Sequence, residues 1–133
     1  AKVRGVEMIP KARSELSSRT TDELVLKFAD ICVEQDQASL QNDLRRYNSL
    51  FDRMVYVEEE LKRRAGDQRR ELLRLYTHSN MQVRLQAAKC TLFVAPIEAR
   101  VQLEAIAGSN WFPQAGDAGM SLWNLDRGVF KPT

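Results

Sequence analysis

The chain has 133 residues, of which 44% are hydrophobic and 29% are charged. This length suits one compact domain, and the composition supplies enough apolar side chains for a buried core. No apolar run approaches the roughly 18 residues that a membrane-spanning helix needs, which argues against an integral membrane protein. The charged opening "AKVRGVEMIPKARSELSS" lacks the apolar stretch of a signal peptide. We therefore expect a protein of the cytoplasm.

The net charge of +2 conceals an uneven distribution along the chain. Residues 20–61 carry ten acidic and four basic side chains, whereas residues 62–84 carry two acidic and seven basic ones. A dedicated nucleic-acid-binding domain is usually basic overall, so the composition argues against nucleic acid as the partner. One basic group is either a solvated face or a surface for an anionic partner. It comprises Lys62, Arg63, Arg64, Arg69, Arg70 and Arg74.

Residues 1–19 show no sustained apolar periodicity and are predicted to form a flexible N-terminal arm. A first helix is predicted to begin at Thr20, because Thr followed three residues later by Glu23 is the pattern of a capping box. The two cysteines, Cys32 and Cys90, lack metal-binding spacing and are expected to be buried free thiols. The buried stripe of the first helix is expected to be Leu24, Phe28, Ile31 and Cys32.

The longest helical pattern lies within residues 38–65, where apolar side chains recur every three or four positions. These side chains are Leu44, Tyr47, Phe51, Met54, Val55 and Leu61. Near its end, "EEELKRR" places three glutamates four residues before Lys62, Arg63 and Arg64, which predicts salt bridges on an exposed helix face. Gly66 is expected to end this helix.

Four shorter helices are predicted after residue 66. The first covers "DQRRELLRLY", and the second follows a polar turn and ends before Pro96. Pro96 and Gly108 are expected to begin and end the third helix. The fourth is expected to run from Pro113 to about Arg127. No segment shows the sustained alternation of a strand, so we predict an all-α fold of about six helices.

The last four helices form two similar pairs. The corresponding residues are Leu73 and Leu103, Tyr76 and Ile106, Ser79-Asn80 and Ser109-Asn110, Ala87-Ala88 and Ala118-Gly119, and Leu92 and Trp123. The offset is 30 residues before the turn and 31 after it. A helix pair of this period is the unit of an α-solenoid, in which neighbouring pairs bury one another's faces. The small residues are expected to allow neighbouring helices to approach closely.

The segment "HSNMQVRLQAAKCTL" resembles the turn and second helix of a HEAT repeat, in which a polar turn precedes Val-Arg and then small residues. Residues 67–95 match well and residues 96–127 less well, because Ala115-Gly116 replaces Val-Arg there. Residues 20–133 also resemble a family of short bacterial proteins of unknown function. The segments that carry this resemblance are "GDQRRELLRLY", "NMQVRLQAAKCTL" and "FPQAGDAGMSLWNLDRGVFKPT".

The resemblance implies a single HEAT-like (armadillo-type) domain over residues 20–133, built as a short right-handed α-solenoid. Its capping helices would occupy residues 20–65, repeat one residues 66–95 and repeat two residues 96–127. In HEAT repeats the arginine equivalent to Arg84 bonds an acidic residue or backbone groups of the adjoining repeat. Asp117 is its natural partner here.

No motif in the sequence favours an enzyme, and we expect no catalytic residue, cofactor or metal. His78 has no acidic or cysteine neighbour in sequence and is expected to be a turn residue. The "GDAG" segment at 116–119 lacks the spacing of a phosphate-binding loop. Close helix packing explains this segment better.

We therefore predict a protein–protein interaction module, such as an immunity, antitoxin or regulatory protein, by analogy from fold to function. Trp111 and Phe112 are expected either to fold into the core, which we prefer, or to form an exposed aromatic anchor for a partner. Two alternatives stay open, a nucleic-acid-binding HEAT-like protein and a structural homodimer paired along residues 38–65. The polar positions expected to contact the partner protein are Gln82, Gln86, Lys89, Gln114, Asp117, Ser121 and Asn124.

Overall fold

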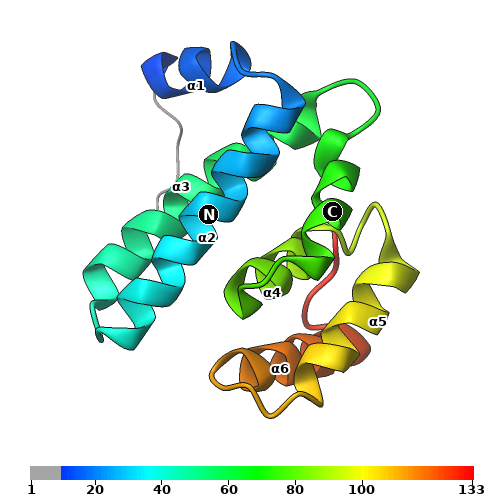
Figure 1. Cartoon of the computed structure of the whole chain (residues 1–133). Coiled ribbons are helices and arrows are strands. Elements are labelled where there is room, and N and C mark those ends of the chain that lie inside the picture. The colour runs from blue at the N-terminus through cyan, green and yellow to red at the C-terminus, as the bar shows by residue number, and fades with distance from the viewer. Residues whose placement is uncertain (1–9) are drawn as a thin grey trace. The chain divides into compact units, whose positions relative to one another are not determined.

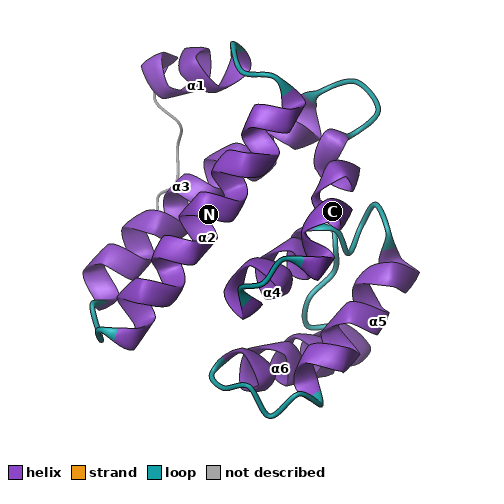
Figure 2. Ribbon diagram, viewed as in Figure 1, coloured by secondary structure: helices purple, strands orange, loops and turns teal. Residues whose placement is uncertain are grey.

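The structure is a computed structural model that describes residues 10–133, with side chains from residue 13 onwards (Figures 1 and 2). This part of the chain is helical and contains no strand, which confirms the all-α prediction. The elements are α1 (Pro10–Ser17), α2 (Thr21–Leu40), α3 (Leu44–Arg63), the 3-10 helix η2 (Gln68–Thr77), α4 (Met81–Cys90), α5 (Pro96–Ala107) and α6 (Gln114–Asp126). The chain divides into two compact units, residues 1–68 and 69–133. This division lies close to the predicted boundary between capping helices and repeats.

The first unit is built around the pair of 20-residue helices α2 and α3, which a short turn joins (Figure 1). The predicted capping box is confirmed. The backbone N–H of Thr20 donates to Glu23 Oε1 at 2.9 Å, and the N–H of Glu23 donates to Thr20 Oγ1 at 3.1 Å. These bonds satisfy two donors that the start of a helix leaves without intrahelical partners. The predicted stripe of α2, Leu24, Phe28, Ile31 and Cys32, is buried.

Helix α3 buries a face that is partly different from the predicted one. Met54 and Leu61 are buried as expected, whereas Leu44 is 70% exposed. Leu50 and Val57, which the pattern did not select, are buried instead. The prediction for Leu44 was wrong because it lies in the first turn of α3, directly after the turn from α2, and contributes nothing to the apolar contact between the two helices.

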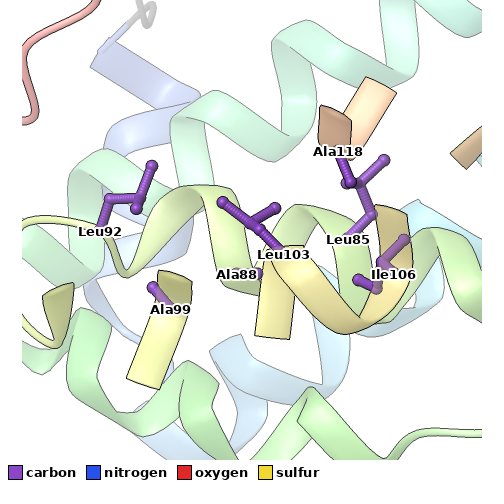
Figure 3. Close-up of a cluster of buried hydrophobic side chains, with 7 residues drawn as sticks. All are labelled: Leu85, Ala88, Leu92, Ala99, Leu103, Ile106 and Ala118. Carbon is purple, nitrogen blue, oxygen red and sulfur yellow. The ribbon is translucent and has the colours of Figure 1, made fainter. Parts of the chain in front are cut away.

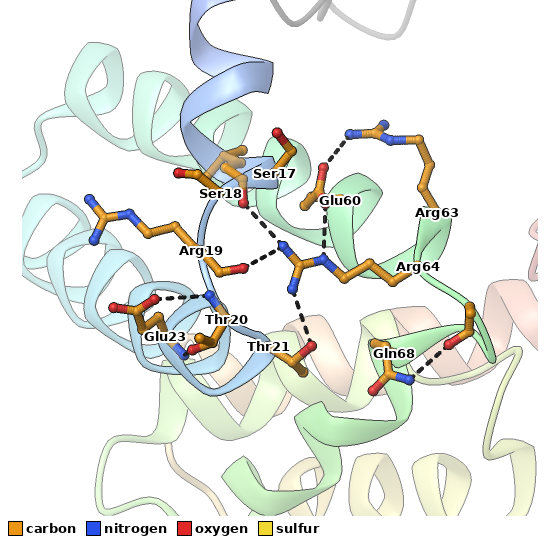
Figure 4. A network of polar contacts seen from close by, with 12 residues as sticks. Ser17, Ser18, Arg19, Thr20, Thr21, Glu23, Glu60, Arg63, Arg64 and Gln68 are labelled. Carbon is orange, nitrogen blue, oxygen red and sulfur yellow. Dashed lines mark hydrogen bonds and ion pairs between the residues drawn. The ribbon is translucent and has the colours of Figure 1, made fainter.

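Residues 10–17 form helix α1, where the sequence led us to expect part of a flexible arm; residues 1–9 of that arm lie outside the described residues. Arg64 lies at the end of α3 and holds the segment after α1. Its guanidinium donates to the carbonyl oxygens of Leu16 and Arg19, at 3.2 and 2.6 Å, and to Thr21 Oγ1 at 3.2 Å (Figure 4). A charged donor that bonds three acceptors holds residues 16–21 in place. Apolar periodicity alone does not reveal such an interaction.

The carboxylate of Glu60 completes this network. It accepts hydrogen bonds from Arg64 Nε at 3.0 Å and Arg63 Nη2 at 2.9 Å (Figure 4). Glu60 is only 6% exposed, so the prediction of an exposed face was wrong for this residue. Burial acts to raise the pKa of the Glu60 carboxyl, but the hydrogen bonds from Arg64 and Arg63 outweigh burial, and the pKa lies below its usual range.

The second unit has a core shared by α4, α5 and α6 (Figure 3). Its members are Leu85, Ala88, Leu92, Ala99, Leu103, Ile106 and Ala118. Three of the seven are alanines, which let the helices approach closely around the larger leucines. Ala88 and Ala118 therefore confirm the expectation that small residues lie at helix contacts. Gly119 does not conform, because a Cβ added there would meet nothing within 4 Å.

Residues of η2, at the start of the second unit, form hydrogen bonds and a ring contact with residues further along the chain. The hydroxyl groups of Tyr76 and Thr91 share a hydrogen bond of 2.6 Å, and Gln102 Nε2 donates to the Tyr76 carbonyl oxygen at 3.1 Å. Arg69 is buried, and its guanidinium lies over the ring of Phe93 at 5.6 Å. Arg69 is therefore part of neither a solvated face nor an anion-binding surface, the two alternatives predicted for the basic group.

Candidate functional site

Three of the predicted partner-binding residues face inward. Gln82, Gln86 and Gln114 are all buried, and Gln114 Nε2 donates to Gln82 Oε1 at 3.0 Å. This bond joins α4 to the first turn of α6. The prediction was wrong for these glutamines, because a polar residue beside small ones was taken to mark the outside of its helix. Here the amide groups pair across the contact between the two helices instead.

The other four polar positions, Lys89, Asp117, Ser121 and Asn124, are brought together on α4 and α6. Lys89 Nζ forms an ion pair with Asp117 Oδ1 at 2.9 Å, and Ser121 Oγ donates to the same oxygen at 3.2 Å. A groove of about 280 Å³ lies alongside. It is lined by Lys89, Leu92, Ser121, Asn124 and Phe130. We call this the α4–α6 groove.

Arg84 does not make the bond that the HEAT resemblance implied. Its Nε donates to the carbonyl oxygen of His78, within the turn that precedes α4. Asp117 is paired with Lys89 instead, because Lys89 lies one turn further along α4 than Arg84. The His78 ring accepts a hydrogen bond at Nδ1 from the N–H of Asn80 at 3.0 Å. His78 therefore acts as a structural turn residue, as predicted.

The C-terminal segment after α6 forms one wall of the groove. Gly128 has a φ of +71°, a left-handed conformation that glycine adopts without strain, and it turns the chain back along α6. The N–H groups of Val129 and Phe130 then donate to the carbonyl oxygen of Asn124, at 2.9 and 3.2 Å. These bonds place Phe130 beside Asn124 and Leu92 in the wall of the groove.

Large aromatic side chains of this unit are exposed. Trp111 and Phe112 are 62% and 68% exposed, so the preferred prediction of a core position was wrong and both side chains lie at the surface. Trp123 is 54% exposed and Phe130 is 48% exposed. The guanidinium of Arg127 lies over the Trp123 ring at 4.6 Å. Aromatic and arginine side chains are the types most often found at binding hot spots.

Sequence reasoning missed Trp123, Phe130 and Leu92 as residues of this surface. Trp123 corresponds to the buried Leu92 in the internal repeat, and that correspondence gives no reason to place it at the surface. One signal in the sequence pointed the other way. A tryptophan does not fit into the space that a leucine occupies in a closely packed repeat, so the change in size itself indicates a different environment.

A second groove, of about 360 Å³, also borders the C-terminal segment. It is mostly apolar and is lined by Leu92, Pro96, Ile97, Arg100, Val101, Leu125 and Pro132. Arg100 at its edge is paired with Asp126 at 2.8 Å and with Glu104 at 3.5 Å. The Arg100 guanidinium lowers the pKa of the Asp126 carboxyl. Leu92 lines both grooves, and the C-terminal segment contributes Phe130 to the first and Pro132 to the second.

Residues 10–133 contain no group of three or more His, Cys, Asp or Glu side chains that could hold a metal ion. Cys32 and Cys90 are free and buried, as predicted, and burial raises the pKa of the Cys32 thiol. None of the helices in this part of the chain combines the length and the apolar character that crossing a bilayer requires.

Comparison with known proteins places the chain in a family. Residues 22–126 match the model of a family described as a domain of unknown function (DUF2019). The crystal structure of the protein RPA1889 from Rhodopseudomonas palustris CGA009 is similar, with 59% sequence identity and a TM-score of 0.87. This similarity covers 89% of the present chain and 98% of that one. No curated protein matches the chain. Because the family model spans most of the sequence, the chain belongs to the DUF2019 family, whose function is unknown.

Proposed function

We propose that this chain is a non-enzymatic protein-interaction module of the cytoplasm, and that it binds its partner through the α4–α6 groove and the aromatic side chains next to it. One observation carries the proposal. Phe130 is 48% exposed and lines this groove together with Leu92, and Trp123, which precedes the lining residue Asn124 on α6, is 54% exposed. Exposing two aromatic rings to water is unfavourable, and partner proteins commonly bury such rings.

The internal repeat supports a HEAT-like architecture for this module. Ala88 of the first pair and Ala118 of the second lie in one core with Leu85 and Leu103 (Figure 3). Helical repeats of this kind commonly present one face to a partner. We propose a short right-handed solenoid, with α2 and α3 as its capping helices.

A nucleic-acid partner is less well supported by the charges. The lysine of the α4–α6 groove is neutralised by Asp117, and Arg100 beside the second groove is neutralised by Asp126. Two cations next to Trp123 and Phe130, Arg127 and Lys131, have no carboxylate partner among the described residues, and two are few for nucleic-acid binding, which commonly neutralises several phosphate groups. A role as an immunity, antitoxin or regulatory protein agrees with a protein partner, and a neighbouring toxin gene would support the first two of these roles.

Site-directed photo-crosslinking tests this function directly. Benzoylphenylalanine is introduced in place of Trp123, and as a control in place of Arg45, which is exposed on α3 of the first unit. Both variants are expressed in the organism that encodes the chain and irradiated. We expect a discrete crosslink to a different protein from position 123 and none from position 45, and the pair should then purify as a stoichiometric complex.

Two outcomes contradict the proposal. If position 123 crosslinks only to a second copy of the chain, the surface is a homodimer interface. If positions 123 and 45 give the same set of weak products, the aromatic surface has no specific partner. The fold of each variant is checked beforehand by circular dichroism, since both positions are exposed and neither substitution is expected to disturb the core.

A further inference from the structure

We infer that the α4–α6 groove and the cations beside it bind an acidic peptide segment of the partner protein, with an apolar side chain of that segment in the groove. The inference rests on the proposed function and adds the chemistry of the partner. The groove itself supplies Leu92 and Phe130. Lys131 follows Phe130 in the chain, and Trp123 and Arg127 lie one residue before and three residues after the lining residue Asn124.

The charges around Trp123 and Phe130 are unbalanced. Arg127 stacks on Trp123, and Lys131 follows Phe130 in the exposed C-terminal segment. Within residues 13–133, neither cation is paired with a carboxylate. Two cations therefore flank the aromatic surface without a local counter-charge.

The nearby carboxylates do not offset these cations, because each has a partner of its own. Asp117 accepts from Lys89 and Ser121, at 2.9 and 3.2 Å. Both oxygens of Asp126 are held by Arg100, at 2.8 and 2.9 Å. The surface consequently has an excess of positive charge that a segment with acidic side chains complements.

The groove provides the apolar part of the recognition. Leu92 and Phe130 form its apolar wall, whereas Lys89, Ser121 and Asn124 form its polar wall. A volume of about 280 Å³ is large enough for a leucine-sized side chain and part of the backbone that carries it. Hydroxyl and amide groups at the polar wall suit the N–H and C=O groups of a peptide backbone. An apolar residue flanked by acidic ones therefore matches both walls and the external cations.

The inference is tested with three synthetic hexapeptides of sequence DELLED, DESSED and KRLLRK, each acetylated and amidated. The full chain, labelled with nitrogen-15, is titrated with each peptide while its amide resonances are recorded by NMR. We expect DELLED to shift amides of residues 89–92 and 121–131 in a saturable manner. DESSED and KRLLRK should bind at least about tenfold more weakly, because the first lacks the apolar side chains and the second repels the cations.

A charge reversal makes the test specific. The R127E/K131E variant is expected to lose the response to DELLED and to gain one to KRLLRK, and raising the salt should weaken both. The matched control is R45E/R53E, which changes the same amount of charge at two exposed arginines of α3 and should respond as the wild type does. The amide spectrum of each variant shows directly whether it is folded. The K131E variant reverses only one of the two charges and is used if the double variant does not fold.

The inference is overturned if DELLED causes no saturable shift, if the shifts lie outside these residues, or if KRLLRK binds the wild type as well as DELLED does. The photo-crosslinking experiment does not depend on charge. A specific crosslink from position 123 together with failure of the peptide titration would therefore preserve the proposed function and exclude only the acidic segment.

Discussion

The two units of the chain place their large apolar side chains differently. In the first unit, Phe28, Leu24, Ile31 and Met54 are buried between long helices, and the exposed large apolar side chains are leucines. In the second unit, alanines occupy much of the core, and both tryptophans are exposed. A core of small residues leaves the aromatic side chains available for the surface. The first unit therefore forms a packed scaffold, whereas the second unit exposes the aromatic side chains on which the proposed binding surface depends.

The units also differ in how they hold their charges. The first unit buries the carboxylate of Glu60 against Arg63 and Arg64. The second unit uses the partly exposed pairs Lys89–Asp117 and Arg100–Asp126. Buried ionic networks impose a unique arrangement on their surroundings, whereas exposed pairs contribute little to stability and can exchange partners. The network around Glu60 is therefore expected to matter more for stability than either of these two pairs of the second unit.

The largest effect is expected from shortening the main aromatic side chain of the scaffold. Phe28→Ala should lower the free energy of unfolding by about 3–5 kcal/mol, because it leaves a cavity between the helices of the first unit. Urea denaturation followed by circular dichroism measures the loss. Leu26→Ala, an exposed position on the same helix, should change the midpoint little. Equal effects of the two substitutions would show that the burial assigned to α2 is wrong.

A pair of substitutions in the second unit tests its small-residue core. Ala88→Leu should destabilise by about 1–3 kcal/mol, because the alanine lies in the closely packed core. Gly119→Ala should instead stabilise by about 0.5–1 kcal/mol, since the added Cβ meets nothing within 4 Å and alanine favours the helix. Urea denaturation of both variants measures the signs. If Ala88→Leu is tolerated without loss, the alanines are not there for close packing.

The buried network of the first unit should make its stability sensitive to acid. The pKa of Glu60 is lowered in the folded state, so its contribution is present above the unfolded value of about 4.3 and is lost as pH falls through the lowered pKa. Glu60→Gln should therefore cost about 1–3 kcal/mol at pH 7 and progressively less below pH ~4. Denaturation at a series of pH values measures this convergence.

The control for that series is Glu59→Gln, which removes a neighbouring carboxylate that is exposed on α3. It should have little effect at any pH. A constant difference between Glu60→Gln and the wild type from pH 7 to pH 3 would contradict the proposed role of the ionised carboxylate.

The smallest effect on stability is expected at the binding surface. Trp123→Ser should change the free energy of unfolding by less than about 0.5 kcal/mol, because the side chain is half exposed. The same change should weaken binding of the crosslinked partner by about 30-fold or more, the loss typical of a hot-spot residue. Titration calorimetry measures it. Leu26→Ser removes an exposed leucine from the first unit and should leave the affinity unchanged; an equal loss in both variants would remove the contrast between the units.

Local features of the sequence determined most of the helix ends. The capping box at Thr20 and Glu23, proline at the start of α5, and Gly108 and Gly128 after α5 and α6 lie where they were predicted. The correspondence of Ala87-Ala88 with Ala118-Gly119 also predicted buried positions of the second unit. Three of these four residues are buried. These features depend on contacts within a few residues, so the chain near each helix end contains all the information needed.

Only the tertiary structure decided which side chains face inward. Gln82 and Gln114 are polar but buried, and a hydrogen bond of 3.0 Å from Gln114 Nε2 to Gln82 Oε1 joins them across a helix contact. Glu60 is buried because Arg63 and Arg64 surround its carboxylate. Trp123 is apolar but 54% exposed, whereas Leu92, its counterpart in the internal repeat, is buried. Periodicity identifies a helix and its faces. Which face is buried, and with which polar partners, depends on residues far along the chain that only folding brings together.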